Sequence, residues 1–372
     1  MSQTLLKRCG IAVAALMLAA CAADKPKPAS LSPLSAKIAG RQVWQAKIDS
    51  VRFPLVVAAL EGQFVVAGDD GTVLALDATT GREAWRGQAG AKLSAGVGSD
   101  GRVAAVVTVQ NELVVMDRGR LAWKTRLPSR TLSPPLVAGG RVFTIGVDRV
   151  VEAFDAQDGR RLWRYQRAGD PLGLAQAGVI TAYRDTLVVG QGPRMAGLDP
   201  SRGTLRWEVP VANPRGTNEV ERLADLVGPA VRQGSTLCVR AFQSAVGCVD
   251  PERGSLQWTR NIGGGQPIGA DEAIVVAADA SDRITAWKRP TGDLAWTSET
   301  FLHRGLSGMR LAGRSVVAGD GQGVVHFLDR DTGEPMLRLS TDGSPVVGMP
   351  AVSGNTLLVV TRSGGLYGFR PE

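Results

Sequence analysis

Short runs of apolar, β-branched residues alternate with glycine-containing turns over most of the chain. Residues 62–67 (GQFVVA) and 71–77 (GTVLALD) are two such runs, and the segment Gly68-Asp-Asp-Gly71 lies between them. Runs of this length and composition on either side of an Asp/Gly turn are typical of a β-hairpin. The pattern therefore predicts consecutive antiparallel strands.

A nine-residue motif punctuates these strands. Asp77 is followed four residues later by Gly81 and four residues after that by Trp85. Full copies, degenerate copies and one half-copy end at Trp44, Trp85, Trp123, Trp163, Trp207, Trp258, Trp296 and Leu337. The spacings between these ends are 41, 38, 40, 44, 51, 38 and 41 residues. Units of about 40–45 residues built from short strands indicate a β-propeller with one four-stranded blade per unit.

The two ends of the series complement each other. The chain stops after residues 350–370, which supply three strands of a unit, and it starts with the missing Trp44 strand. Pairing these strands would complete a blade and close the ring without a free edge. We therefore expect an all-β fold over residues 38–372, an eight-bladed propeller of four-stranded antiparallel blades, with the tryptophans packed between blades. Seven blades would require one degenerate copy to be spurious.

The first twenty residues differ from the repeat and resemble an export signal. Lys7 and Arg8 precede an apolar run of ten residues, 11–20, which is too short to span a bilayer. The sequence Leu18-Ala-Ala-Cys21 resembles the lipobox of bacterial lipoproteins. The resemblance implies cleavage before Cys21, lipidation of Cys21 and, because Ala22 follows it, delivery to the outer membrane.

Residues 21–37 have no hydrophobic period and contain Pro26, Pro28 and Pro33. We expect this segment to be a flexible tether behind the lipidated cysteine, about 50 Å long at full stretch. The expected organisation is thus a signal peptide at 1–20, an anchor and tether at 21–37, and the propeller.

Charge and cysteine content exclude several classes of function. Lys and Arg number 43 against 35 Asp and Glu, but no dense basic block occurs, so nucleic-acid binding is not expected. The chain has only two histidines and four cysteines, and no Cys-x-x-Cys, so we expect no metal site. Cys238 and Cys248 lie on neighbouring strands of one blade. They are compatible with a cross-strand disulfide or with two small buried thiols.

The repeat resembles the quinoprotein (PQQ-type) propeller repeat, which occurs in alcohol dehydrogenases and in non-enzymatic relatives. The whole chain resembles the BamB family, the lipoproteins of the outer-membrane β-barrel assembly (BAM) complex. Segments outside the generic repeat carry this likeness best: residues 216–225, 302–304 and 316–327. The resemblance implies a scaffold that faces the periplasm from the outer membrane and assists folding and insertion of outer-membrane proteins.

In that family two loops bind a POTRA domain of BamA. One loop carries Leu-x-Leu-Arg, which here is Leu172-Gly-Leu174-Ala175, so alanine stands where arginine is expected. The other carries Arg-Leu-x-Asp-x-Asp, which here is Arg222-Leu-Ala-Asp225-Leu-Val227, so valine replaces the second aspartate. The resemblance thus implies BamA contacts at Leu172, Leu174, Arg222 and Asp225, and contacts with unfolded outer-membrane proteins are compatible with it.

The repeat spacing points to the same region. The two longest units lie between Trp163 and Trp258, and insertions into a regular array form loops on one face, often the binding face. Residues 213–227 are polar at first and end in Leu223, Leu226 and Val227. These leucines and the valine either serve a partner surface or pack under their own loops.

The alternative function is a periplasmic PQQ-dependent dehydrogenase. By resemblance, such enzymes have a calcium-binding set, a catalytic aspartate and commonly two adjacent cysteines. The chain has no adjacent cysteines, and its repeat aspartates occupy turn positions. No G-x-S-x-G, P-loop or H-E-x-x-H motif occurs. We therefore expect no enzymatic activity and no cofactor.

Overall fold

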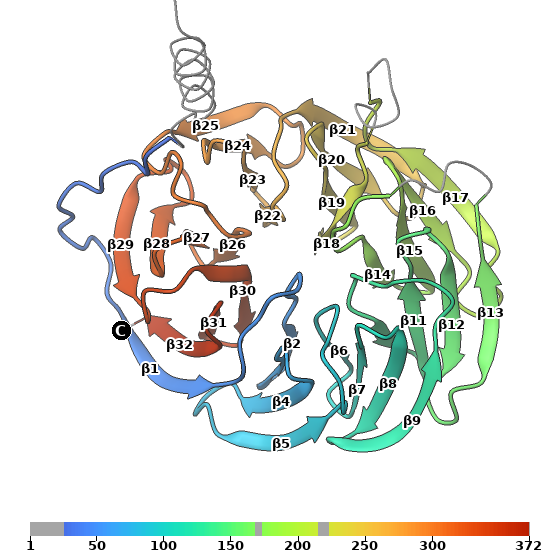
Figure 1. Cartoon of the computed structure of the whole chain (residues 1–372). Coiled ribbons are helices and arrows are strands. Elements are labelled where there is room, and N and C mark those ends of the chain that lie inside the picture. Colours follow the sequence, from blue (N-terminus) through green and yellow to red (C-terminus); the bar gives the residue numbers. More distant parts are fainter. Residues whose placement is uncertain (1–25, 168–172, 215–222, 372) are drawn as a thin grey trace, which may run out of the picture.

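The computed structural model describes residues 26–167, 173–214 and 223–371. Its 32 strands, β1 to β32, form eight four-stranded antiparallel sheets arranged around a ring (Figure 1). The predicted all-β, eight-bladed propeller is confirmed. Within the described ranges, no helix is long and apolar enough to cross a membrane.

We number the blades from the first complete one. Blade one comprises β2 (Ala58–Leu60), β3 (Gln63–Ala67), β4 (Thr72–Asp77) and β5 (Glu83–Gln88). Blade two comprises β6 (Gly98–Ser99), β7 (Val103–Val107), β8 (Glu112–Asp117) and β9 (Arg120–Arg126). Blade three comprises β10 (Leu136–Ala138), β11 (Arg141–Ile145), β12 (Val151–Asp155) and β13 (Arg161–Tyr165). Blade four comprises β14 (Ile180–Tyr183), β15 (Thr186–Gln191), β16 (Arg194–Leu198) and β17 (Leu205–Pro210).

The remaining blades continue in the same order around the ring. Blade five comprises β18 (Leu226–Gln233), β19 (Thr236–Ala241), β20 (Ala245–Asp250) and β21 (Ser255–Asn261). Blade six comprises β22 (Gly269–Ala270), β23 (Ile274–Ala278), β24 (Ile284–Lys288) and β25 (Leu294–Ser298). Blade seven comprises β26 (Arg310–Ala312), β27 (Ser315–Gly319), β28 (Val324–Asp329) and β29 (Pro335–Ser340). Blade eight comprises β30 (Val346–Ser353), β31 (Thr356–Thr361), β32 (Gly365–Pro371) and β1 (Gly40–Lys47).

Blade eight closes the ring with strands from both ends of the chain. Strand β1 pairs antiparallel with β32, from Gly40 opposite Pro371 to Lys47 opposite Gly365. The predicted closure is therefore confirmed. Because β1 pairs with β32 in one sheet, the ring closes without an unpaired edge between the first and the last strand.

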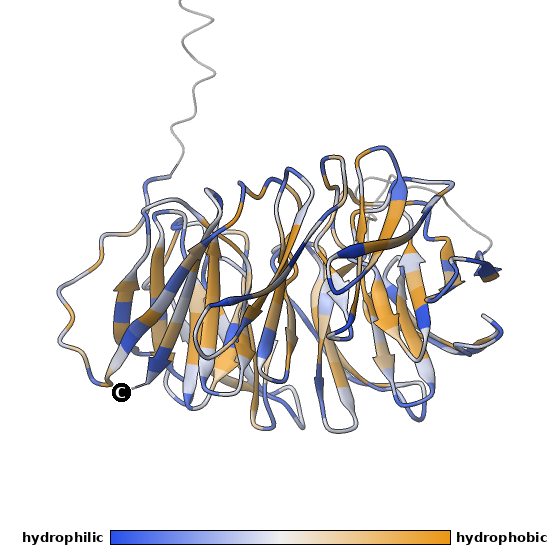
Figure 2. Ribbon diagram, turned by 90° about the horizontal axis from the view of Figure 1, so that it is seen from below, coloured by the Kyte–Doolittle hydropathy of each residue, from blue (hydrophilic) through white to orange (hydrophobic). Residues whose placement is uncertain are grey.

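The hydrophobic core consists of eight clusters, each lying between two neighbouring blades. Seen from the side, apolar stretches run through the strands and polar positions collect at the turns of both faces (Figure 2). This arrangement follows from the alternation in sequence, because both faces of each sheet are covered by the adjacent blades.

The repeat tryptophans seal seven of these eight interfaces. The Trp44 ring lies over Gly81 of the next blade, where an added Cβ would approach the ring to 2.5 Å. Gly81 has φ of 68°, so both the turn and the ring require glycine at this position. The Trp44 indole N–H donates to the carbonyl oxygen of Ala78 at 3.0 Å. The same hydrogen bond to the next blade recurs at Trp123, Trp163, Trp258 and Trp296.

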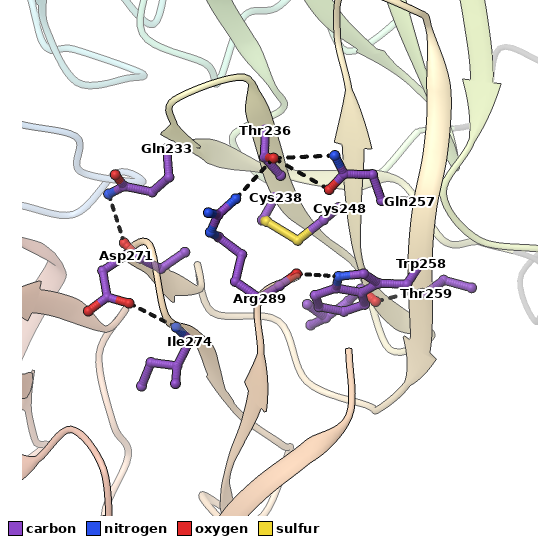
Figure 3. Close-up of a disulfide and its surroundings, with 12 residues drawn as sticks. Gln233, Thr236, Cys238, Cys248, Gln257, Trp258, Thr259, Asp271, Ile274 and Arg289 are labelled. Carbon is purple, nitrogen blue, oxygen red and sulfur yellow. Dashed lines mark hydrogen bonds between the residues drawn. A yellow bond between two sulfur atoms is a disulfide. The ribbon is translucent and has the colours of Figure 1, made fainter. Parts of the chain in front are cut away.

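A disulfide joins the second and third strands of blade five. Cys238 on β19 lies directly opposite Cys248 on β20, and their sulfur atoms are bonded (Figure 3). Both residues are at most 1% exposed. Cys248 is also opposite Trp258 on β21, so the bridge belongs to the packed interface between blades five and six.

Peptide mapping tests this bridge. Arg240 lies between the two cysteines, so trypsin cuts the denatured chain into peptides 233–240 and 241–253, with one cysteine each. Without reductant, we expect these two peptides to run as one linked species that dithiothreitol separates. Separate peptides with free thiols before reduction would show that the bridge does not form.

The described N-terminal segment, residues 26–39, lies along blade seven. The Ala29 amide donates to the Leu302 carbonyl at 2.8 Å, and the Arg338 guanidinium donates to the Ser32 carbonyl at 2.6 Å. Further along, the Lys37 amide donates to the Met336 carbonyl at 2.8 Å. This part of the expected tether is thus hydrogen-bonded to the propeller.

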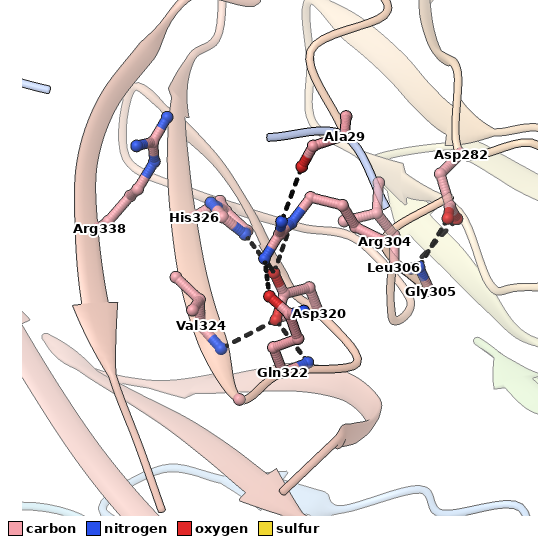
Figure 4. A network of polar contacts seen from close by, with 12 residues as sticks. Ala29, Asp282, Arg304, Gly305, Leu306, Asp320, Gln322, Val324, His326 and Arg338 are labelled. Atoms are coloured by element: carbon pink, nitrogen blue, oxygen red, sulfur yellow. Dashed lines mark hydrogen bonds and ion pairs between the residues drawn. The ribbon is translucent and has the colours of Figure 1, made fainter. Parts of the chain in front are cut away.

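A buried polar network supports the attachment at Ala29. Arg304 donates to the Ala29 carbonyl at 2.9 Å through Nη1 and to the Asp320 carboxylate at 2.8 Å through Nε (Figure 4). His326 Nε2 lies 2.9 Å from the same carboxylate. Arg304, Asp320 and His326 are 5%, 0% and 1% exposed. These residues come from two of the segments that carry the family likeness, 302–304 and 316–327.

The network shifts the pKa values of two of its members. Burial alone would raise the pKa of Asp320, but hydrogen bonds from His326, the Val324 amide and Arg304 lower it to about 2. Burial lowers the pKa of His326 below its usual value, despite the opposing effect of Asp320. His326 is therefore neutral at neutral pH. With Nε2–H directed at Asp320, its buried Nδ1 has no partner.

The His326 shift predicts a pH dependence of stability. Its pKa is lower in the folded than in the unfolded chain, so the unfolded chain binds more protons just below pH 6.5. The free energy of unfolding should then fall as the pH decreases from about 7.5 to about 5.5. His326→Gln keeps a donor and removes the titrating group, so we expect a smaller decrease. Urea titrations at both pH values measure this, and equal decreases in the two proteins would contradict it.

Candidate functional site

The structure describes some of the residues expected to bind BamA and not others. Leu172 and Arg222 lie outside the described residues, as does the expected lipidation site, Cys21. Leu174 and Asp225 are described, and both lie in connections between blades. Leu174 lies between β13 and β14, and Asp225 lies immediately before β18.

Asp225 joins the two expected loops. One oxygen of its carboxylate accepts a hydrogen bond from the Leu174 amide at 2.7 Å. The other oxygen accepts a hydrogen bond from Arg149 Nη2 at 2.7 Å. Leu174 and Asp225 are 51 residues apart in the sequence, and Arg149 is 76 residues from Asp225. The ring therefore brings three connections together around one carboxylate.

Arg149 comes from the turn between β11 and β12, and local contacts fix its position. It has φ of 61°, and its carbonyl accepts a hydrogen bond from Gln191 Nε2 at 3.0 Å. Gly192 allows the guanidinium to approach closely, because an added Cβ there would lie 3.3 Å from it. The arginine is thus held against blade four rather than extended into solvent. The sequence did not predict this contact, because a single arginine in a hairpin turn matches no motif.

Glycine is also required in the Leu174 loop. An added Cβ on Gly173 would lie 2.6 Å from the Val147 carbonyl oxygen and 3.4 Å from Asp225. A larger residue would push the loop away from the turn that carries Arg149. The Gly-Leu pair at 173–174 therefore sets how closely the Leu174 amide approaches its acceptor.

The loop that carries Asp225 is anchored to the Leu174 loop where its chain enters β18, the innermost strand of blade five. Gly228 donates its amide to the Ala177 carbonyl at 2.9 Å, and Gly178 pairs with Val227 through an isolated bridge. Leu226 and Val227 are 3% and 4% exposed. Of the two interpretations offered for these residues, packing within the protein is the correct one. Val227, where the family motif has aspartate, belongs to the core, whereas Ala175 is exposed.

The part of the site that the structure describes leaves no room for a small-molecule ligand. Arg149, Leu174 and Asp225 line a cavity of about 40 Å³, enough for only one or two water molecules. The Arg149 and Asp225 side chains are 22% and 18% exposed, so the ion pair is half-buried. Leu174 beside a half-buried ion pair is a combination suited to a protein partner.

A larger cavity lies on the axis of the ring. It has a volume of about 720 Å³, and its polar lining includes Gln243, Asp279, Asp282 and Arg362. The Asp282 carboxylate accepts hydrogen bonds from the Gly305 and Leu306 amides at 2.7 and 3.1 Å. Burial raises the pKa of Asp282 above its usual value. Among the described residues, no group of three or more His, Cys, Asp or Glu could hold a metal ion.

Comparison with known proteins identifies the family. The family model described as "Outer membrane protein assembly factor BamB" matches residues 33–93, 69–298 and 289–372. A protein of that name from Burkholderia pseudomallei is 35% identical over 368 residues, which cover 97% of each chain. One from Bordetella pertussis is 32% identical over 347 residues, covering 92% of this chain and 90% of the relative.

Solved structures share the fold. The crystal structure of BamB from Moraxella catarrhalis superposes with a TM-score of 0.80 at 23% identity, covering 89% of this chain and 99% of that one. Quinohemoprotein alcohol dehydrogenase from Comamonas testosteroni superposes with a TM-score of 0.67 at 15% identity, covering 89% of this chain and 76% of that one. At these identities the structural likeness establishes the propeller alone. On the family model and the two relatives above 30% identity, the chain belongs to the BamB family of outer membrane protein assembly factors.

Proposed function

We propose that this chain is a non-enzymatic scaffold that assists folding and insertion of outer-membrane proteins. The observation that carries the proposal is the match to relatives named as outer membrane protein assembly factors, which extends over 97% of the chain. The match includes the N-terminal region and all eight blades. A relationship confined to the generic repeat would have supported the fold only.

The partner we propose is BamA, through one of its POTRA domains, within the BAM complex. The contact surface comprises Leu172 and Leu174 on one loop and Arg222 on the other. Asp225 acts as a positioning residue, because its carboxylate accepts hydrogen bonds from the Leu174 amide and from Arg149. Its carboxylate thus aligns the two loops as one surface.

We further propose that residues 1–20 are a cleaved signal, that Cys21 carries the lipid anchor, and that residues 38–372 form the propeller on the periplasmic side of the outer membrane. The contacts of Ala29 with Leu302 and Arg304 attach the expected tether to the propeller close to its start. Ala29 lies eight positions after Cys21, a distance of at most about 28 Å in a fully extended chain. Blade seven is then the blade held nearest the membrane.

The alternative is a PQQ-dependent dehydrogenase. The quinohemoprotein alcohol dehydrogenase shares only the propeller at 15% identity. The relatives that match at 35% and 32% identity are both named as assembly factors. The scaffold is therefore the better-supported function.

Affinity purification of the tagged full-length chain from solubilised outer membrane distinguishes the two functions. The proposal predicts recovery of BamA, with no quinone absorbance and no alcohol oxidation in the eluate. Recovery of PQQ with dehydrogenase activity and no BamA would refute it.

A further inference from the structure

One blade interface lacks the tryptophan that seals the others. In seven blades a tryptophan on the outer strand faces a small residue on the neighbouring strand: Trp44 and Gly368, Trp85 and Ala75, Trp123 and Val115, Trp163 and Ala153, Trp207 and Gly197, Trp258 and Cys248, and Trp296 and Ala286. In blade seven Leu337 faces Phe327. In this blade the aromatic side chain is therefore on β28 rather than on the outer strand β29.

Without a tryptophan on β29, no indole ring extends from blade seven to blade eight. At the interface between blades six and seven, Trp296 lies over Gly333 and donates to the Arg330 carbonyl at 2.8 Å. At the following interface, the residue in the place of that glycine is Gly40. An added Cβ there would meet only a methyl group of Leu337, at 3.0 Å, and the Arg370 carbonyl oxygen, at 3.5 Å. No indole therefore covers Gly40.

A cavity of about 400 Å³ occupies this interface between blades seven and eight. Its apolar lining includes Ile38, Phe327, Leu337, Leu339 and Phe369. Phe369 and Leu337 are buried, while Phe327 and Leu339 are only half-buried, although both pack on the cluster between these blades. Exposed residues such as Gly354 and Asn355 line it as well, so the cavity opens to solvent. Its volume lies within the range of pockets that bind small ligands.

We propose that this cavity, which we call the indole pocket, binds an aromatic side chain of a partner protein, tryptophan above all. The same molecule shows the complement, since a tryptophan ring covers the corresponding glycine at other blade interfaces, as Trp44 covers Gly81. Phe327 and Phe369 offer rings for edge-to-face or offset contact, and Gly40 offers a flat backbone surface. The indole pocket lies in blades seven and eight, so it is separate from the proposed BamA surface.

The occupant must come from another molecule. The chain has 8 Trp, 8 Phe and 3 Tyr, and every one of them falls within the described ranges. The residues outside those ranges contain no aromatic side chain that could fold into the pocket. Within the described chain, the seven repeat tryptophans are already seated in their own interfaces.

Titration of N-acetyl-L-tryptophanamide into the full-length chain tests the proposal. With 13C-labelled leucine methyl groups, we expect the Leu339 signal to shift and saturate, whereas N-acetyl-L-leucinamide shifts it at least tenfold less at equal concentration. Leu337→Trp fills the pocket from within and should weaken binding at least tenfold. The double variant Phe327→Ala/Leu337→Trp copies the Ala286 and Trp296 pair of blade six and guards against a clash with Phe327.

Leu294→Trp is the matched control, because it adds the same ring to an outer strand at a residue 62% exposed. It should leave the affinity within twofold of wild type. No saturable shift of Leu339 in the wild-type chain would overturn the proposal. An undiminished shift in the folded Leu337→Trp single and double variants would overturn it equally, because the amide would then bind elsewhere.

Discussion

Replacing Arg304 by alanine is expected to lower the free energy of unfolding by about 3–5 kcal/mol, the usual cost of removing one partner from a buried ion pair. The Arg304 and Asp320 side chains are 4% and 0% exposed, and two nitrogens of the guanidinium reach the same carboxylate oxygen. Without Arg304, Asp320 stays buried with His326 as its remaining side-chain partner. Equilibrium denaturation followed by tryptophan fluorescence measures the loss.

The variant should also release the N-terminal segment, because Arg304 donates a hydrogen bond to the Ala29 carbonyl oxygen. We expect faster tryptic cleavage after Lys37, which lies on blade seven in the wild-type chain. Arg102→Ala is the control, since it breaks a comparable pair with Asp117 whose side chains are 69% and 40% exposed. Exposed pairs contribute little, so its denaturation curve should overlay that of wild type. Equal curves for all three proteins would show that the network is not stabilising.

Replacing Asp225 by alanine is expected to weaken binding to the purified periplasmic region of BamA at least tenfold, or about 1.4 kcal/mol. The substitution removes the acceptor of both the Leu174 amide and Arg149, so the two loops lose their common support. Asp225→Asn keeps one acceptor oxygen and should retain part of the affinity. Surface-immobilised BamA and the full-length chain in detergent suffice for the measurement.

Asp331→Ala is the matched control for this experiment. Asp331 is paired with Arg314 and Arg330 on blade seven, away from the loops that carry Leu174 and Asp225. Its substitution should leave BamA affinity unchanged. If Asp225→Ala binds as tightly as wild type, the site carried over from the family is wrong for this chain.

The architecture was predictable because it depends on local periodicity. Each blade contributes its own turn glycine and, in seven of the eight, its own tryptophan, so the count of blades and the closure through Trp44 follow from the sequence. The opposition of Cys238 and Cys248 follows in the same way, because both lie in one hairpin. These features depend on contacts within a unit or between adjacent units.

The features that escaped prediction depend on contacts between distant segments. Arg149 reaches Asp225 from 76 residues away, and Arg304 reaches Ala29 from 275 residues away. The sequence also does not reveal that Phe327 supplies an aromatic ring opposite Leu337. A repeat copy without its tryptophan looks the same whether or not the facing residue is aromatic. Hydrophobic pattern does not encode such pairs, which appear only once the ring is assembled.

The central claim, assembly of outer-membrane proteins, is tested most directly in cells of the source organism that lack this chain. The measurement is the amount of folded β-barrel protein in the outer membrane, from heat-modifiable bands on semi-native gels. We predict a lower amount without the chain, restored by the wild-type gene and less completely by the Asp225→Ala gene. An unchanged amount of folded β-barrel protein would contradict the account.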